Sequence, residues 1–266
     1  MTDQTGQGDA RRSMALLWGR TAPPTRGPKQ GLSVERIVAT AVALADAEGL
    51  DSLSMRKVGE RLGTSAMALY TYVPTKAELL DLMLDRTLGE LPTVYDRASG
   101  WRGAAQEWAA EMWAWYLRHP WVLQVASPRP LLGPNELATH EARLAIFDDL
   151  GLEPVEVVRV AGALTSYVAG AARAVAQVRT TDARGRQSED DWWYERSALL
   201  DEMGQFDWEE RFPVSSKLSA AGAFDQTTRT ADDEAGYLER ESLDDFTFGL
   251  ARLLDGIAVL VESRRS

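Results

Sequence analysis

The sequence predicts an all-α protein that consists of an N-terminal three-helix helix-turn-helix domain and a C-terminal helical domain. Apolar residues recur every three or four positions along most of the chain, which is the spacing of helices that bury one face. A glycine at position 63 separates two short helical stretches, and an apolar seam runs through residues 246–261. We expect domains at residues 1–31, 32–91 and 92–266.

The composition is that of an ordinary globular protein and excludes several classes of function. Of the 266 residues, 45% are hydrophobic and 26% are charged. The chain has no cysteine, which excludes disulfides, thiol chemistry and zinc fingers. It has no run of about 18 apolar residues and no secretion signal. We therefore expect a cytoplasmic protein without a membrane span.

The net charge of −11 is divided unevenly along the chain. Residues 10–76 contain ten Lys or Arg against five Asp or Glu, whereas residues 77–266 carry a net charge of −14. This asymmetry indicates that the N-terminal part meets a polyanion and that the acidic remainder does not. An uneven solvated surface is the alternative interpretation.

Residues 1–31 are rich in Gly, Thr, Gln, Pro and Arg, so we expect a disordered basic extension with a short helical turn at residues 13–18. Its arginines could reach phosphates or the minor groove of DNA. A solvated tail is the simpler interpretation of the same composition.

Capping residues delimit the helices of the N-terminal domain. Ser33 is expected to cap a helix that closes at Gly49, and Thr75 with Glu78 has the spacing of a capping box. Gly63 ends one short helix, because glycine adopts the left-handed conformation at little cost. Two helices that meet across so short a turn cross steeply, which is the helix-turn-helix arrangement.

The second helix of this motif is expected to present a small, uncharged surface. Its solvent-facing residues carry methyl groups, hydroxyls and two phenols: Ser65, Ala66, Met67, Ala68, Tyr70, Thr71 and Tyr72. Such a surface can approach base edges in the major groove. Arg56 and Lys57 lie in the first turn of the preceding helix, where cations oppose the helix dipole unless an anion such as a phosphate lies nearby. A helical hairpin with an ordinary solvated face is the alternative.

The C-terminal part contains a stripe of aromatic residues. Trp101, Trp108 and Trp115 follow at seven-residue intervals, with Met112 on the same face. Three tryptophans on one face suit an apolar or planar ligand, although by count alone a plain core is the more frequent role of such a stripe.

Two long helices are expected, one at residues 153–179 and one at the C-terminal end. The second carries a heptad-like seam of Phe246, Leu250, Leu253, Ile257 and Leu260, which Leu254 and Val261 widen. A seam of this width needs a partner, which is either the first long helix of the same chain or the same pair of helices in a second chain. The polar stretches at residues 180–191 and 227–241 are expected to be loops.

The run from Leu53 to Leu80 resembles the DNA-binding domain of the tetracycline-repressor (TetR) family. The family's Leu-Tyr-x-Tyr/His/Trp-Val/Phe-x-x-Lys signature is matched by Leu69, Tyr70, Tyr72, Val73 and Lys76. The two long C-terminal helices are similar to those that form a four-helix dimer interface in the tetracycline-repressor C-terminal domain. The resemblance implies a dimeric, all-helical transcriptional regulator, usually a repressor that a small molecule releases from its DNA operator.

Candidate site residues follow from these patterns and from the resemblance. The implied DNA-binding residues, with Lys57 added for its charge, are Arg56, Lys57, Ser65, Ala66, Met67, Ala68, Tyr70, Thr71, Tyr72 and Lys76. The candidate ligand-binding residues are Trp108, Met112, Trp115, His140, Leu144, Phe147, Thr165 and Val168. The candidate dimer-interface residues are Leu164, Val168, Ala171, Leu250, Leu253, Ile257 and Leu260. Because Ala66 and Ala68 are less polar than the side chains of some family members, we expect few direct hydrogen bonds to bases.

Neither an enzyme nor a metal or cofactor site is expected. The sequence has no Gly-rich phosphate loop, no G-x-S-x-G motif and no metal-ligand spacing. His119 precedes a proline at a helix end and is expected to be structural. His140 lies on a helix, and its side chain is expected to face solvent or the core, with a place in the ligand pocket as the alternative. The alternative functions are an all-helical small-molecule binding protein without specific DNA affinity, and an activator on the same scaffold. The tryptophans favour a hydrophobic, aromatic effector.

Overall fold

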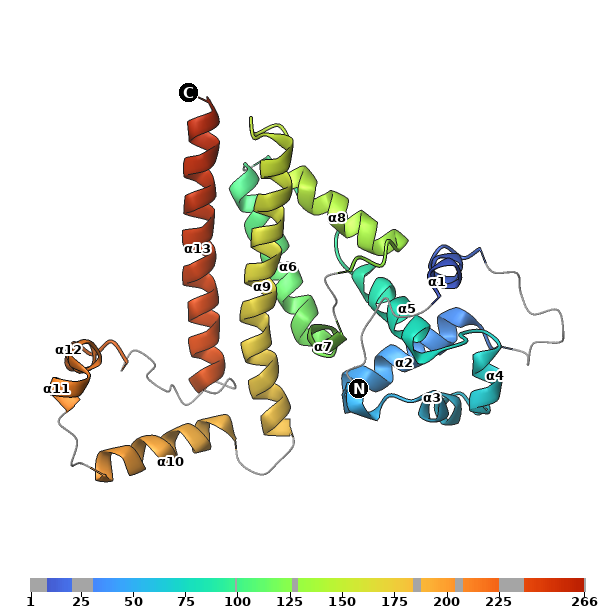
Figure 1. The fold of residues 1–266 in the computed structure, drawn as a ribbon, viewed down its shortest axis with the longest axis horizontal. Helices are drawn as coiled ribbons and strands as arrows, with labels where there is room; N and C mark the ends of the chain where they lie inside the picture. The colour runs from blue at the N-terminus through green and yellow to red at the C-terminus, as the bar shows by residue number, and fades with distance from the viewer. Residues whose placement is uncertain are drawn as a thin grey trace. The chain divides into compact units, whose positions relative to one another are not determined.

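The computed structural model describes residues 9–20, 31–98, 100–125, 129–183, 188–203, 208–224 and 237–265. Every regular element within these ranges is helical, which confirms the predicted all-α class (Figure 1). In chain order the elements are α1 (Ala10–Leu17), α2 (Val34–Glu48), the 3₁₀ turn η1 (Leu50–Ser52), α3 (Met55–Arg61), α4 (Ala66–Tyr70), α5 (Lys76–Leu88), α6 (Trp101–Arg118), α7 (Val122–Val125), α8 (Pro134–Phe147), α9 (Pro154–Ala183), α10 (Glu189–Glu202), α11 (Trp208–Arg211), α12 (Pro213–Ala220) and α13 (Tyr237–Arg265).

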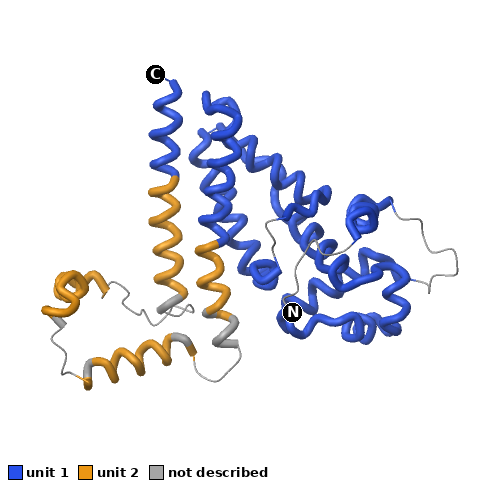
Figure 2. The backbone as a smooth tube through the Cα atoms, viewed as in Figure 1, with its two compact units in different colours: residues 1–169, 254–266 blue, residues 170–253 orange. Residues whose placement is uncertain are grey.

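The chain divides into two compact units (Figure 2). The first unit comprises residues 1–169 and 254–266, and the second comprises residues 170–253. The helix-turn-helix, α6 and α8 belong to the first unit. This unit also contains the N-terminal part of α9 and the C-terminal part of α13.

The first predicted helix begins and ends at the expected residues. The Ser33 hydroxyl accepts the backbone N–H of Arg36 at 3.3 Å, and α2 ends at Gly49, which has a φ of 78°. α2 packs on α3 and α5 and buries Ile37 and Leu44 completely or nearly so. It therefore supports the helix-turn-helix from within the first unit.

The N-terminal extension contains a helix that the sequence analysis expected only as a short turn. α1 packs against α5, and Leu16 and Leu17 are buried. The expectation of a disordered chain is therefore wrong for residues 9–20, because the burial of two leucines offsets part of the conformational entropy lost on ordering. Residues 1–8 and 21–30 of the predicted extension lie outside the described residues.

A buried carboxylate fastens α1 to α5. Glu78 is fully buried, and its Oε1 accepts a hydrogen bond from Arg12 Nε at 2.5 Å. The predicted capping box is consequently half formed. The backbone N–H of Glu78 donates to Thr75 Oγ1 at 3.2 Å, but the Glu78 carboxylate pairs with Arg12 and does not return to the cap.

The tryptophan stripe of α6 faces the interior. Trp108 and Trp115 are each 2% exposed, and Trp115 Nε1 donates to the carbonyl oxygen of Thr87 at 2.9 Å, which joins α6 to α5. Trp101 packs against Phe147 of α8 with ring centroids 6.0 Å apart. Since α8 also packs on α5, these three helices form one continuous core.

The polar stretches predicted as loops are partly helical. Residues 180–183 end α9, residues 189–191 begin α10 and residues 237–241 begin α13. Helices extend into polar sequence because each added residue gains a backbone hydrogen bond once the helix is nucleated. Residues 184–187 and 227–236 lie outside the described residues.

One helical stretch in the described part of the chain, residues 154–177 of α9, could cross a membrane by its length and composition. Its mean hydropathy is 1.2, and only 28% of the apolar window is buried within the chain. No span was expected from the sequence, because it has no uninterrupted run of about 18 apolar residues. A helix with this composition also suits a protein in which a partner covers the open side.

Candidate DNA-binding surface and small-molecule cavity

Local backbone features hold the helix-turn-helix. Ser54 and Ser65 cap α3 and α4, and each hydroxyl accepts a backbone N–H at 3.3 Å. Between them Gly63 has a φ of 65°, the left-handed conformation that the sequence predicted. A Cβ atom at Gly59 would lie 2.8 Å from the carbonyl oxygen of Thr64. The turn therefore approaches α3 more closely than a larger residue allows.

α4 and the turn after it carry the uncharged surface. Leu69 and Val73 are fully buried and fix the orientation of the segment. α4 ends at Tyr70, so Thr71 and Tyr72 lie in the turn that follows. Among the predicted DNA-facing residues, the exposed ones are Ser65, Met67, Tyr70 and Thr71, and the half-exposed ones are Ala66, Ala68 and Tyr72. The described surface thus offers methyl groups, a thioether and hydroxyls.

Two of the predicted phosphate contacts carry carboxylate partners in the free protein. Arg56 pairs with Glu60 one turn along α3, and Lys57 Nζ lies 3.1 Å from Glu48 Oε2. All four side chains are at least a third exposed, and exposed pairs of this kind contribute about 0–1 kcal/mol. A phosphate can therefore replace either carboxylate at little cost. Lys76, the remaining predicted cation, opens α5.

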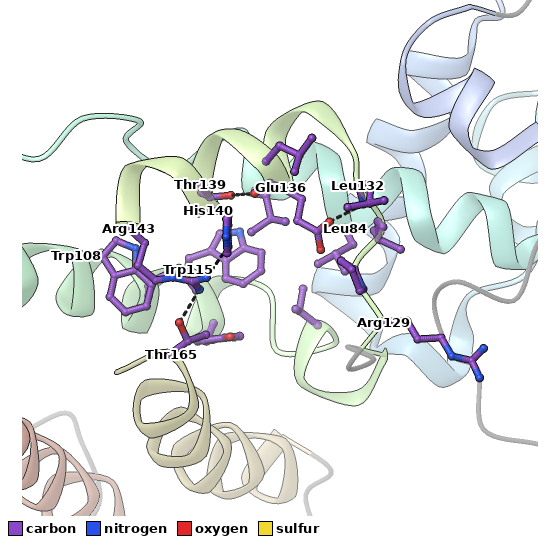
Figure 3. Close-up of a pocket in the computed structure, with 17 residues that line it drawn as sticks. Leu84, Trp108, Trp115, Arg129, Leu132, Glu136, Thr139, His140, Arg143 and Thr165 are labelled. Carbon is purple, nitrogen blue, oxygen red and sulfur yellow. Dashed lines mark hydrogen bonds between the residues drawn. The ribbon is translucent and has the colours of Figure 1, made fainter. Parts of the chain in front are cut away.

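A cavity of about 430 Å³ lies in the first unit, lined by residues of α5, α6, α8 and α9 (Figure 3). Its volume is within the range of small-molecule sites. Leu84, Met112 and Leu137 are among its apolar lining residues, and Trp108 and Trp115 add aromatic wall. The cavity therefore suits a ligand with substantial apolar surface.

The polar end of the cavity is organised around Arg143 of α8. Its Nη1 donates to Thr165 Oγ1 at 2.6 Å and its Nη2 donates to His140 Nδ1 at 2.7 Å (Figure 3). Because a guanidinium has no acceptor, Nδ1 of His140 must accept, which places the imidazole proton on Nε2. Burial and the charge of Arg143 both lower the pKa of His140, so the ring is neutral.

Residues 129–132, which precede α8, line the cavity, and the first turn of α8 is fastened to α5. Asp85 Oδ1 accepts the backbone N–H groups of Asn135 and Glu136 at 3.1 Å and 3.0 Å. Burial raises the pKa of Asp85, although these hydrogen bonds oppose the shift. A Cβ atom at Gly133 would lie 2.2 Å from Asp85 Oδ1, so the contact requires glycine. Glu136 accepts the N–H of Leu132 at 2.7 Å and keeps the segment folded.

The end of α1 contacts the same segment. Trp18 Nε1 donates to the carbonyl oxygen of Leu132 at 3.0 Å. Leu132 has a φ of 58°, which is uncommon for a residue other than glycine. Together with the pair of Arg12 and Glu78, this bond connects α1 both to α5 and to the cavity lining.

A buried histidine links α2 to the end of α6. His119 Nδ1 lies 2.8 Å from Asp46 Oδ1, and its Nε2 lies 3.1 Å from Glu90 Oε2. Trp121 Nε1 donates to the same Asp46 oxygen at 2.7 Å. Burial would lower the pKa of His119, but its bonds to the two carboxylates outweigh burial and raise it. The expectation of a structural His119 agrees with this placement.

The cavity brings together most, though not all, of the predicted ligand residues. Those that line it are Trp108, Met112, Trp115, His140 and Thr165. Phe147 and Val168 are fully buried in the helical core, and Leu144 is half-buried on α8 away from the lining.

The polar lining that α8 contributes to the cavity was not predicted from the sequence, apart from His140. Glu136, Thr139 and Arg143 line the cavity together with His140. Each of these four residues is three or four positions along the chain from another of the four. Helical spacing from His140 could have found them, because such residues share a helix face. Leu84 of α5 also lines the cavity, although its helix was assigned to the N-terminal domain.

The predicted dimer-interface residues are largely covered within the single chain. Leu164, Val168, Leu250 and Ile257 are buried, and Ala171, Leu253 and Leu260 are half-buried. In the first unit α13 buries Leu254 and Val261, the two residues expected to widen the seam. The buried stripe of α13 therefore runs through Leu254 and Val261, whereas Leu253 and Leu260 of the predicted seam are only half-buried.

In the first unit, α9 and α13 keep an exposed apolar side. Val155 and Val158 of α9 are 53% and 54% exposed, and Val259 of α13 is 66% exposed. Gly162 is also exposed, and a Cβ atom there would have nothing within 4 Å. Another helix can approach closely at such a position, and exposed apolar surface of this kind is typical of protein contacts.

Two family models match the chain. The model for bacterial regulatory proteins of the tetR family matches residues 37–83, and the model for the tetracyclin repressor-like C-terminal domain matches residues 95–261. α1 lies before both matches.

Several known proteins are similar to this chain. The HTH-type transcriptional repressor DrrR1 of Streptomyces coeruleorubidus is 41% identical over 265 residues, which cover 99% of this chain and 91% of the relative. An HTH-type transcriptional regulator of Saccharopolyspora erythraea is 35% identical over 188 residues, 71% of this chain and 79% of the relative. Among solved structures, Streptomyces coelicolor ActR in complex with actinorhodin has a TM-score of 0.66 and 26% identity, covering 86% of this chain and 96% of that chain.

Proposed function

Because the chain belongs to the TetR family of transcriptional regulators, a non-enzymatic family, we propose that it is a repressor that a small molecule releases from DNA. In this proposal two copies bind a palindromic operator through residues 32–91. Residues 92–266 bind the effector and form the dimer. As a regulator of transcription it acts in the cytoplasm, where the DNA is.

The observation that carries the proposal is the double role of α5. This helix begins at Lys76, directly after the recognition segment, and its Leu84 lines the cavity. Asp85, the next residue, holds the first turn of α8. A ligand that displaces this lining therefore acts on the helix that also carries the DNA-binding end.

The recognition surface supports binding in the major groove. Met67 is 75% exposed and Tyr70 is 40% exposed, and neither is charged. Methyl groups and hydroxyls can contact thymine methyls and base edges, while Arg56, Lys57 and Lys76 surround them with positive charge for phosphates. Affinity then comes chiefly from the cations and sequence preference from the uncharged surface.

Dimerisation is supported by the exposed side of α9 and α13. Val155, Val158 and Val259 would lie in the interface, with Gly162 allowing close helix approach. The predicted interface residues Leu164, Val168 and Ile257 are buried inside the subunit. In this proposal they pack beneath the interface and do not contact the second copy. A two-fold dimer places its recognition helices about 34–36 Å apart, one turn of DNA.

The cavity supports a small hydrophobic effector. ActR, a similar protein, was solved with actinorhodin bound. An effector changes operator occupancy only by its difference in affinity for the DNA-bound and released conformations. A shift from 99% to 1% occupancy needs a difference of about 10⁴-fold. An effector that fills a cavity bordered by α5 can supply such a difference.

The direct test is footprinting of the full-length protein on the intergenic DNA that flanks its gene. We expect a protected inverted repeat, and transcription in vitro from that promoter should decrease when the protein is added. Protection of a single unrepeated half-site would contradict the dimer. An increase in transcription would indicate an activator.

Two substitutions separate a regulator from a binding protein without DNA affinity. Tyr70→Ala combined with Lys76→Ala should abolish operator binding and leave ligand binding unchanged. Lys217→Ala, which removes an exposed lysine of α12, is the matched control and should leave both unchanged. Operator binding that survives the double substitution would exclude this surface as the DNA contact.

A further substitution tests the interface. Val158→Asp should convert the dimer to a monomer in sedimentation equilibrium, because it places a charge on the exposed apolar side of α9. Val94→Asp is the control, since Val94 is 81% exposed in a loop. A Val158→Asp protein that remains dimeric would move the interface elsewhere.

A further inference from the structure

Arg143 is a cation in the cavity that lacks a carboxylate partner among the described residues. Its two hydrogen bonds go to Thr165 Oγ1 and His140 Nδ1, both uncharged acceptors. A guanidinium has five N–H donors, so three remain uncommitted. One of them is Nε, which is buried and has no hydrogen-bond partner in the described structure.

The carboxylate of Glu136, on the same helix face, compensates this charge only in part, because its charge raises the pKa of Arg143 less than burial lowers it. Glu136 accepts the backbone N–H of Leu132 and does not form an ion pair with Arg143. Burial raises the pKa of Glu136 and lowers the pKa of Arg143, so each group lies in a poorly hydrated place. Burying a charge without an ionic partner is unfavourable, and an anion brought by a ligand would relieve that cost.

The surroundings of Arg143 are flat and aromatic. Its guanidinium carbon lies 5.9 Å from the centroid of the Trp108 ring, within the range of a cation–π contact. Trp115 adds a second aromatic surface to the cavity (Figure 3). Thr165 and His140 hold the guanidinium in place from two sides, so its free donors have a fixed direction.

We propose that the effector is a planar aromatic acid, whose carboxylate pairs with Arg143 and whose rings lie against Trp108 and Trp115. The inference rests on the proposed function and names the chemical class of its effector. A planar guanidinium binds the two oxygens of a carboxylate through parallel hydrogen bonds. A neutral aromatic compound would leave the buried cation unpaired, and an amine would be repelled by it.

The test compares three probes of nearly equal shape on the unmodified protein by isothermal titration calorimetry. They are anthracene-2-carboxylate, anthracene-2-carboxamide and 2-(aminomethyl)anthracene. The carboxylate should bind about 10–100-fold more tightly than the carboxamide, as expected for charge-assisted hydrogen bonds. The amine should bind more weakly than the carboxamide.

Substitutions then assign the preference to one residue. Arg143→Met should bring carboxylate and carboxamide within about threefold, whereas Arg143→Lys should keep part of the preference because the charge remains without the planar fork. Arg129→Met is the matched control. Arg129 also lines the cavity, but its side chain points away from Arg143 in Figure 3, so the preference should persist.

Three outcomes would overturn the inference. They are equal binding of carboxylate and carboxamide by the unmodified protein, tighter binding of the amine, and absence of binding by all three probes. A preference that survives Arg143→Met would also overturn it. None of these results bears on the operator footprint, which tests the proposed function without a ligand. Conversely, a clear carboxylate preference with no inverted-repeat protection would retain this binding site and refute the repressor.

Discussion

Cations occur on the candidate DNA-binding surface and in the cavity, but their partners differ. Arg56 and Lys57 are exposed and pair with the carboxylates of Glu60 and Glu48. Arg143 is partly buried, and its hydrogen bonds to Thr165 and His140 go to neutral acceptors. The difference shows how one chain can bind exposed phosphates and a buried anion in different ways. Exposed pairs exchange readily with the surrounding ions, whereas a held, buried cation selects by shape and charge.

The largest expected effect is a difference in salt dependence between operator binding and ligand binding in the cavity. If Arg56, Lys57 and Lys76 of both subunits contact phosphates, operator affinity should fall about 10³-fold between 50 and 200 mM salt, because six phosphate contacts release counterions. Binding of an anionic probe in the cavity should change only about twofold to threefold, because buried charges are screened less. Fluorescence anisotropy and calorimetry at four salt concentrations measure the two slopes. Equal slopes would break the comparison.

The second prediction concerns the buried carboxylate that holds the cavity lining. Asp85→Ala removes a carboxylate that accepts the backbone N–H groups of Asn135 and Glu136. Leaving these donors without a partner should destabilise the protein by about 2–4 kcal/mol. Thermal unfolding followed by circular dichroism measures the loss. The control is Glu141→Ala, which changes an exposed residue of α8. It should alter the free energy of unfolding by less than about 0.5 kcal/mol.

The third prediction uses pH. The folded pKa of His119 lies above its unfolded value, so its stabilising contribution is complete below about pH 6.5 and is lost as pH rises through the folded pKa. The melting temperature of the unmodified protein should therefore fall between pH 6 and 9 relative to that of His119→Gln, which has no titrating group at this position. Thermal unfolding of both proteins across this pH range measures the difference. Parallel curves would show that the link from Asp46 to Glu90 does not depend on protonation.

The smallest expected effect concerns the exposed pairs. Glu60→Gln frees Arg56 for phosphate and should raise operator affinity about twofold to threefold, while stability changes by less than about 0.5 kcal/mol. Anisotropy and thermal unfolding measure the two quantities. Glu141→Gln, on α8, removes the same charge away from the helix-turn-helix and should leave operator affinity unchanged. A large stability loss from Glu60→Gln would show that this pair is more than an exchangeable surface contact.

Local signals predicted the N-terminal helices well. Ser33 and Thr75 act through hydrogen bonds to the backbone three residues away, and Gly63 acts through its own φ. Such interactions are written in consecutive residues, so the sequence shows them directly. The helix-turn-helix could therefore be placed without knowing what it packs against.

The cavity and the seam depend on contacts between distant residues. Arg143 and Thr165 meet only because α8 and α9 fold against each other, and no short pattern records that contact. In α13, leucines at both 253 and 254 satisfy a helical period, so packing alone decides that Leu254 is buried. α1 was expected only as a short turn at residues 13–18 for the same reason, since Leu16 and Leu17 are apolar residues in a polar stretch until α5 covers them.

The pair of Arg12 and Glu78 has a practical consequence for anyone who shortens this protein. The matched family region begins at residue 37, which makes removal of the first twenty residues look harmless. Such a truncation would strand the fully buried Glu78 carboxylate without its counterion and remove the Trp18 bond to Leu132. Measurements on the shortened protein would then report a weakened α5 and cavity lining that the full-length protein does not have.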